Sequence, residues 1–359
     1  MTHELRFGEI DPLAIGAWIL GTGGGGSPYL AQLCLKRLYA QGKRVRIIQP
    51  EDLDDDQMVG VASMMGAPLV LLERLVNPEE LARAVQLMES TMNCKFTALM
   101  PIEIGGGNAL APFLAAALLD LPIVDADAMG RAFPEATNSS FSIGDLKMYP
   151  MALVDSRGVE AIVAKTPDWH WLERASRALC TEFGSVTATC KAPRTGAEVK
   201  KWGVLNTVTQ SINIGRAVQN ARERLEDPVA AVLAQESGKL IFQGKIMDVD
   251  RTTSGGFLRG NCNIAGTDSD KGQNIRLAFQ NEWIAAFSGD EPVASTPELI
   301  CLLDTESGES IGTETVRYGQ RVSVVVLAAP GHLTTTKGLR HVGPRAFGYD
   351  FDYRSVFAA

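Results

Sequence analysis

Two aspartates that stand two residues apart, Asp125 and Asp127, are the first candidates for chemistry in this sequence. They follow a short apolar run, Ile123-Val124, that is typical of a β-strand. Residues two apart on a strand project from the same face, so a strand that continues to Asp127 would point both carboxylates the same way. Open α/β sheets bind their ligands at the carboxyl edge, and the pair therefore predicts a catalytic or binding site there.

Glu103 and Glu135 extend this pair to a cluster of carboxylates. Such a cluster could bind a hard divalent cation through its oxygens, or it could supply a general base. We therefore take Asp125, Asp127 and Glu103 as candidate catalytic residues. The alternative is structural: Asp127 would only cap a short helix at 128–133, and Glu135 would be exposed.

Basic side chains near these acids offer further functional groups. Arg131 could clamp a carboxylate or carbonyl oxygen with its planar fork, or it could form an ion pair with Asp127 or Glu135. Among the four histidines we favour His332, because it follows Pro330-Gly331 in a loop. The absence of an HExxH motif excludes a classical zinc-protease site. If a metal ion is bound, its candidate ligands are Asp125, Asp127, Glu135 and His332.

Two glycine-rich turns, Gly21–Ser27 and Gly105–Asn108, could present backbone N–H groups to a ligand. Ahead of a helix, such groups bind an anion, an oxyanion or a ring carbonyl. The first turn lies between two expected helices and lacks a following Gly-Lys-Ser/Thr, so neither the dinucleotide nor the P-loop pattern is met. Tight packing turns are the alternative, and Asn108 could cap the helix after the second turn. The candidate substrate-binding residues are Gly23, Gly24, Gly25, Gly106, Gly107, Asn108 and Arg131.

The alternation of strands and helices predicts the fold that must position these residues. In the first half, apolar β-prone runs are separated by helical stretches, which is typical of an α/β domain with a mainly parallel sheet. From residue 239 onward, turn residues separate successive β runs, which predicts a β-rich α+β domain. We place the two domains at 1–167 and 168–359.

Composition and charge limit the partners. The chain has 359 residues and a net charge of −8, so neither a nucleic acid nor an anionic membrane is the expected partner. No apolar run reaches the roughly 18 residues that span a bilayer, and the N-terminal residues lack a signal-peptide core. The six cysteines show no disulfide or metal-binding spacing, which favours a cytoplasmic protein with reduced thiols. The oligomeric state stays open, with a homo-oligomer through the β-rich unit as one option.

Four motifs together resemble one bacterial protein family. They are GTGGGGSP at 21–28, EIGGGN at 103–108, PIVDADAMGRAFPE at 122–135 and GPRAFGYD at 343–350. In this order and spacing they resemble the S-methyl-thiohydantoin desulfurase-like family, once a domain of unknown function, over essentially the whole chain. The resemblance implies a cytosolic enzyme that hydrolyses an S-methylated thiohydantoin, a five-membered cyclic ureide, to a hydantoin and methanethiol. Relatives occur beside or fused to hydantoinase- or oxoprolinase-type enzymes, which implies such a partner.

A mechanism follows from the residues and the resemblance together. Water would attack the ring carbon that bears sulfur, with Asp125, Asp127 or Glu103 as general base or as ligand of an activating metal ion. The glycine turns and Asn108 would hold the ring, and Arg131 would orient an acidic substituent. Two other functions stay open: a non-catalytic ligand-binding or accessory subunit of a hydantoinase-type enzyme and, from the glycine run alone, a nucleotide-binding protein. The cofactor also stays open, with one divalent metal ion as an option.

Overall fold

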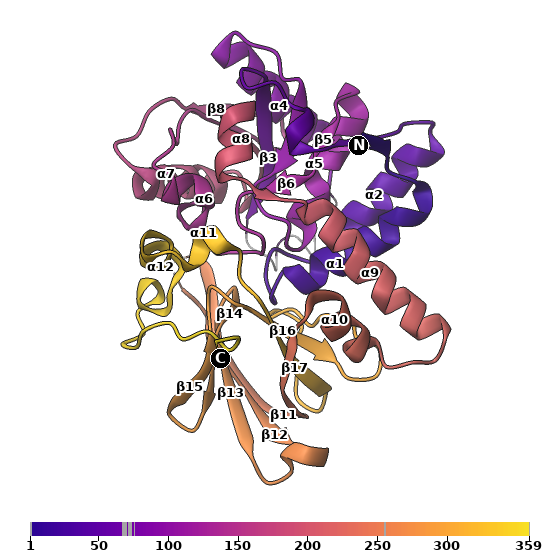
Figure 1. The fold of residues 1–359 in the computed structure, drawn as a ribbon. Coiled ribbons are helices and arrows are strands. Elements are labelled where there is room, and N and C mark those ends of the chain that lie inside the picture. Colours follow the sequence, from indigo (N-terminus) through magenta and orange to yellow (C-terminus); the bar gives the residue numbers. More distant parts are fainter. Residues whose placement is uncertain (1, 67–69, 71–73, 75, 255, 359) are drawn as a thin grey trace.

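The computed structural model of the chain describes residues 2–66, 70, 74, 76–254 and 256–358. Figure 1 shows an α/β part, formed by the chain up to α10 (Pro228–Glu236), and a β part below it. The last segment, drawn in yellow, leaves the β part and places α11 (Gly331–Thr334) and α12 (Thr336–Val342) beside the α/β part. The expected two-part architecture is therefore present.

An eight-stranded mixed sheet forms the centre of the α/β part. In spatial order its strands are β1 (His3–Glu4), β2 (Arg46–Ile48), β5 (Ile123–Val124), β4 (Ala98–Pro101), β3 (Met58–Gly66), β9 (Val186–Thr195), β7 (Met151–Val154) and β8 (Glu160–Val163). The four strands from β2 to β3 are parallel, whereas β1, β9, β7 and β8 pair antiparallel to their neighbours. The expectation of a mainly parallel sheet is correct for the middle of the sheet and wrong for its edges. The hairpin of β7 and β8 explains one edge, because a tight turn can join only antiparallel strands.

Helices cover both faces of this sheet. Successive side chains of a strand point to opposite faces, so each strand contributes to two different cores. In β4, Leu99 packs into one core, whereas Ala98 and Met100 pack into the other. The first face carries α1 (Ile10–Leu20), α2 (Tyr29–Ala40), α4 (Pro78–Met92), α5 (Gly107–Leu119) and α9 (Thr207–Glu223). The second face carries α6 (Ser140–Ile143), α7 (Trp169–Glu182) and α8 (Gly196–Trp202), together with α11 and α12.

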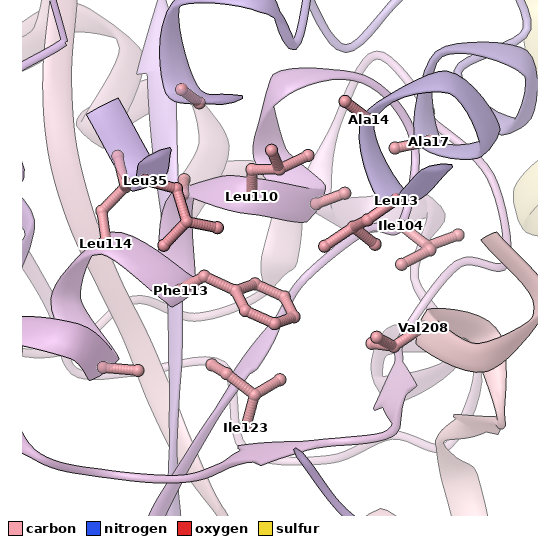
Figure 2. Close-up of a cluster of buried hydrophobic side chains, with 14 of the residues drawn as sticks. Leu13, Ala14, Ala17, Leu35, Ile104, Leu110, Phe113, Leu114, Ile123 and Val208 are labelled. Carbon is pink, nitrogen blue, oxygen red and sulfur yellow. The ribbon is translucent and has the colours of Figure 1, made fainter. Parts of the chain in front are cut away.

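The larger core lies between the first face of the sheet and its helices (Figure 2). Leu13 of α1, Leu35 of α2, Phe113 of α5, Ile123 of β5 and Val208 of α9 all belong to it and are fully buried. Helices from distant parts of the sequence thus share one core, and this core fixes the ends of β4 and β5 from which the predicted site residues project.

Residues beyond 167 contribute to the α/β part. β9 lies inside the first sheet, between β3 and β7. α9 packs on α1 so closely that a Cβ at Gly16 would stand 1.8 Å from the carbonyl oxygen of Ser211. The chain therefore passes from one sheet to the other between α10 and β11 (Lys239–Ser254), well after 167/168. The domain boundary that we placed at 167/168 stays a prediction.

The β part is a seven-stranded sheet in which all neighbours are antiparallel. Its strands, in spatial order, are β15 (Glu291–Ser295), β14 (Glu282–Ser288), β13 (Asn274–Gln280), β12 (Phe257–Gly266), β11, β17 (Arg321–Leu327) and β16 (Leu299–Asp304). β14 and β16 touch although four strands lie between them in this order, so the sheet curls around a second core that contains Trp283 and Phe242. The expected β-rich second unit is present, and its curl brings β14 next to the α/β part.

Two short strands, β6 (Ala126–Asp127) and β10 (Val204–Leu205), form a separate antiparallel pair. Five 3-10 turns complete the described elements, at Phe7–Glu9, Pro50–Asp52, Ala136–Asn138, Asp268–Asp270 and Pro344–Phe347. Within the described ranges, no helix combines the length and apolarity that crossing a membrane requires.

Candidate functional site

A cleft opens where the carboxyl ends of β3 and β4 meet the beginning of β14. It encloses about 700 Å³, including the volume that is open to solvent. Apolar side chains of Met64, Met65, Ile102, Met129 and Phe133 form part of its wall. Its polar lining consists of Ser63, Glu103, Asn108, Glu135, Glu173, Arg177, Lys191, Asn281 and Glu282. A pocket with apolar walls and a few convergent polar groups is the usual form of a small-molecule site.

Glu103 is the buried carboxylate at the end of β4. Its Oε1 accepts a hydrogen bond of 2.7 Å from Asn108 Nδ2, and its Oε2 accepts one of 3.2 Å from the backbone N–H of Phe133. Burial raises the pKa of Glu103 to about 7, and these two hydrogen bonds oppose the rise only in part. Glu103 can therefore gain or lose a proton near neutral pH, as a general base must.

Asn108 orients Glu103 and does not cap the helix that follows. α5 begins at Gly107, and Gly106 occupies the position before its first residue. The Asn108 side chain instead accepts a hydrogen bond of 2.8 Å from the backbone N–H of Met64 and donates to Glu103. Because β3 holds one end of the amide and Glu103 the other, the carboxylate is fixed in one orientation toward the cleft.

Glu282, the first residue of β14, brings a second buried carboxylate into the cleft. Burial raises its pKa well above the ordinary value, and repulsion from Glu103 raises it further. Its Oε1 lies so close to Gly24 that a Cβ added there would stand 2.0 Å from it. Two buried carboxyl groups in one site cannot both carry charge easily, so the protonated form of Glu282 is favoured.

Lys191 adds a buried amino group to the same cleft. It stands on β9, and its Nζ lies 2.5 Å from Ser63 Oγ and 3.2 Å from Thr189 Oγ1. Burial lowers its pKa, while the nearby acids Glu173 and Glu103 favour its charged form. Glu173 itself pairs with Arg177 at the wall of the cleft, with 3.0 Å between Oε1 and Nε.

Asp125 lies in a different place from the cleft lining. Its Oδ1 accepts hydrogen bonds from the backbone N–H groups of Val208 at 2.8 Å and Thr209 at 3.1 Å, and the Thr209 hydroxyl donates to Oδ2. These donors belong to the first turn of α9, where backbone N–H groups have no partner within the helix. The position of Asp125 therefore matches a helix cap supplied from the bend between β5 and β6.

Asp127 links the loop after β4 to the loop after β6 through hydrogen bonds to their backbones. Its Oδ2 accepts three backbone hydrogen bonds, from Ile104 at 2.9 Å, Met129 at 3.0 Å and Gly130 at 2.8 Å. Burial raises its pKa to about 7, and the hydrogen bonds from Gly130, Met129 and Ile104 oppose this. Asp127 is not part of the cleft lining, but it holds the loop that carries Glu103.

Arg131 is fully buried, and it forms an ion pair with neither Asp127 nor Glu135. Its guanidinium donates to three groups beyond its own neighbour, namely the Glu298 carbonyl at 2.7 Å, the Thr22 hydroxyl at 2.7 Å and the Trp283 carbonyl at 3.2 Å. Since these groups belong to both parts of the molecule, the structure places Arg131 as a connector and not in the cleft lining.

The glycine turns pack against each other and against β14. A Cβ at Gly23 would meet the Trp283 ring at 2.5 Å, and one at Gly106 would stand 2.6 Å from the Gly25 carbonyl. The N–H of Gly106 donates to Ala17, and that of Gly107 donates to Gly25 and Gly26. These N–H groups are therefore used within the protein, and of the predicted glycines only Gly25 lines the cleft.

The candidate metal ligands do not meet. Glu135 lines the cleft, whereas the His332 ring packs on Trp202 with 5.9 Å between centroids. Among the residues that the structure describes, no group of three or more His, Cys, Asp or Glu side chains is arranged to hold a metal ion. The requirement for a metal stays a prediction.

Of the polar residues of the cleft, sequence reasoning missed six: Ser63, Glu173, Arg177, Lys191, Asn281 and Glu282. A signal for Lys191 was available, because Thr187, Thr189 and Lys191 alternate with apolar residues and so share one face of a strand. Nothing local indicated Ser63 or Glu282, since the first depends on the register of β3 with β9 and the second on the contact between the two parts.

Fold and site together define a two-part α/β and β protein with an acidic cleft between its two sheets. Residues 8–165 match the domain described as "S-Me-THD-like, N-terminal domain", and residues 167–356 match "S-Me-THD-like, C-terminal domain". The chain therefore belongs to the S-Me-THD-like family, which confirms the resemblance seen in the four motifs.

A crystal structure of a protein from Chromobacterium violaceum has the same fold. It superimposes with a TM-score of 0.83 at 21% sequence identity, over 99% of this chain and 100% of that one. At this identity the likeness extends to the fold alone. No curated protein matches the sequence.

Proposed function

We propose that this protein hydrolyses an S-methylated thiohydantoin to the hydantoin and methanethiol. The family description supports a ligand of this class, and one observation of the site supports hydrolysis. That observation is the buried Glu103 carboxylate, which lines the cleft, is oriented by Asn108, and has a pKa that burial raises to about 7. Such a group accepts a proton from water at neutral pH and releases it again within one cycle.

The chemistry divides between the two glutamates of the cleft. In the hydrolytic step, a water oxygen bonds to the ring carbon C2 while Glu103 takes one of its protons. The C2–sulfur bond breaks, and the departing methanethiolate takes the proton of Glu282. The second proton of the water moves to a ring nitrogen, and C2 becomes a carbonyl carbon. The proton on Glu103 then passes to Glu282, so that one water and one substrate give one hydantoin and one methanethiol. Glu103 and Glu282 are both buried, and the low dielectric of their surroundings strengthens these charge effects.

The roles of Asp125, Asp127 and Arg131 change in this proposal. We retain Glu103 as the base and assign the other three to positioning, because none of the three lines the cleft and their carboxylate or guanidinium groups bond to backbone and hydroxyl groups. Asn108 remains a substrate-site residue through its contact with Glu103.

Release of methanethiol from the S-methyl derivative of thiohydantoin, followed with a thiol reagent, tests the reaction, with the hydantoin identified by mass spectrometry. We expect turnover that rises with pH around a midpoint of about 7, the pKa to which burial raises Glu103. Glu103→Gln should lower kcat by about 10²–10⁴-fold. Asn108→Ala should move the midpoint upward, because its hydrogen bond favours the charged form of Glu103.

Tight binding of the ring without methanethiol release would overturn the enzymatic proposal. It would instead favour an accessory subunit of a hydantoinase-type enzyme, and co-purification with such an enzyme would then be the measurement to make. An unchanged midpoint in Asn108→Ala would remove Glu103 as the group that titrates.

A further inference from the structure

A hydroxyl–amine pair lines the cleft beside the two glutamates. Ser63 Oγ on β3 and Lys191 Nζ on β9 are 2.5 Å apart, and both residues line the cleft. They meet because β3 and β9 are antiparallel neighbours, with Val61 opposite Lys191 and Ser63 opposite Thr189. The pair is held on rigid strands and not on mobile loops, which is the arrangement that a reactive geometry requires.

The Ser63 hydroxyl and the Lys191 amine are close enough for a proton to pass between them. Thr189 Oγ1 lies 3.0 Å from the Ser63 carbonyl, where it donates, and it does not line the cleft. Ser63 Oγ lies 2.9 Å from Thr189 Oγ1 and 2.5 Å from Lys191 Nζ. Of the two hydroxyls, only that of Ser63 therefore combines contact with the amine and a place in the cleft wall.

Burial disfavours the charged form of Lys191, and this shifts its amine toward the state that can accept a proton. Lys191 is only 6% exposed, and its amino group is held by hydroxyls. Burial lowers its pKa, the positive charge of Arg177 lowers it further, and Glu173, Glu103 and Cys190 act in the opposite direction. A serine next to an uncharged lysine is an established form of activated nucleophile.

We propose that Ser63 is a covalent nucleophile of this cleft and that Lys191 is its general base. This inference rests on the proposed function and adds an enzyme-bound intermediate to it. Ser63 Oγ attacks C2 of the ring and its proton moves to Lys191 Nζ. The C2–sulfur bond breaks, methanethiolate leaves with the proton of Glu282, and the ring stays bound to Ser63 through a C2–Oγ bond.

Water then releases the product. Its oxygen bonds to C2 while Glu103 takes one proton, and the second water proton ends on a ring nitrogen. The C2–Oγ bond breaks, and Ser63 Oγ regains its proton from Lys191. Transfer of the proton from Glu103 to Glu282 restores the starting state, so the sum is one water consumed per methanethiol released, with no oxidant or reductant.

Trapping the intermediate tests this assignment. Glu103→Gln should slow the attack of water on the enzyme-bound intermediate. The S-methyl derivative of thiohydantoin should therefore give a burst of about one methanethiol per chain. Intact mass spectrometry should then show an adduct of substrate mass less methanethiol, and fragmentation should place it on the peptide with Ser63. Glu103→Gln/Ser63→Ala should show neither. The control Glu103→Gln/Ser323→Ala, which removes a fully buried strand hydroxyl of the β part, should keep both.

A substrate-independent probe keeps the outcomes separate. A small alkyl fluorophosphonate should label Ser63 in the unaltered protein, and labelling should fall at least tenfold in Lys191→Met. Methanethiol release without adduct, together with Ser63→Ala turnover equal to that of the unaltered protein, would overturn the covalent step and leave direct hydrolysis standing. Absence of methanethiol release by the unaltered protein would overturn the proposed function, and with it the role of Ser63.

Discussion

The guanidinium group of Arg131 donates a hydrogen bond of 2.7 Å to the backbone carbonyl of Glu298. Arg131 comes from the loop after β6 in the α/β part, whereas Glu298 immediately precedes β16 of the curled sheet. The same guanidinium also contacts Thr22 and Trp283 and stacks 4.5 Å over the Phe133 ring. One fully buried side chain thus links both sheets and the first glycine turn, next to the cleft.

Arg131→Ala should therefore destabilise the protein by about 3–5 kcal/mol, because buried carbonyls lose their charged donor. Urea unfolding followed by tryptophan fluorescence would measure this loss. Arg345→Ala is the matched control. Within the described part of the chain, the exposed Asp350 and Asp352 are the ion-pair partners of Arg345, so the unfolding midpoint of this variant should stay within error of that of the unaltered protein. A small loss in Arg131→Ala would show that the interface does not depend on this contact.

Asp125→Ala should lower the free energy of unfolding by about 2–4 kcal/mol, because it removes the cap of α9 and leaves buried donors at Val208 and Thr209 unpaired. Asp125→Asn, which keeps one acceptor oxygen, should lose less. Methanethiol release per folded molecule should be retained in both variants at a temperature where they are folded. Loss of activity with an intact fold would restore the catalytic role that the D-x-D spacing suggested.

Gly24→Ala should disturb the cleft through Glu282. The new Cβ would stand 2.0 Å from Oε1 of Glu282 and 2.4 Å from its carboxyl carbon, so the carboxyl group must move. We expect a loss of about 1–3 kcal/mol in stability and a tenfold or greater fall in kcat. Gly8→Ala is the control, because an added Cβ there meets nothing within 4 Å. Equal activity in the two variants would argue against a role of Glu282 in the reaction.

The buried Asp127 predicts a definite pH dependence of stability. Burial raises its pKa to about 7 in the folded state, whereas an unfolded aspartate has a pKa of about 3.9. Between these values the folded protein binds more protons, so the free energy of unfolding falls as pH rises through this window. Glu103 contributes to the same fall in the free energy of unfolding, because burial raises its pKa as well.

Asp127→Asn should flatten this slope by at most about 1.4 kcal/mol per pH unit, the value for one proton. Unfolding in urea at several pH values between 4 and 8 would measure the slope. The exposed Asp56→Asn should leave it unchanged. A slope in Asp127→Asn as steep as in the unaltered protein would mean that Asp127 is ionised throughout.

Several local elements followed from the sequence because their causes are local. The apolar runs around the first glycine turn predicted the helix–turn–helix of α1 and α2, and alternating β-prone and helical stretches predicted the parallel middle of the first sheet. The prediction that Asp125 and Asp127 project from one face of a single strand was wrong. β5 ends at Val124, and Asp127 belongs to β6, which pairs with β10, so the two carboxylates are not on one continuous strand.

The sequence by itself determined the apolar alternation, the turns and the presence of Glu103 and Asn108 at the end of a buried strand, because these depend on neighbouring residues. Only the tertiary structure decided which other groups meet them. Ser63 and Lys191 are 128 positions apart and are joined by the register of two strands. Glu282 reaches Gly24 only because the second sheet curls and packs on the first. Register and packing minimise the free energy of the whole chain, so no local pattern encodes them.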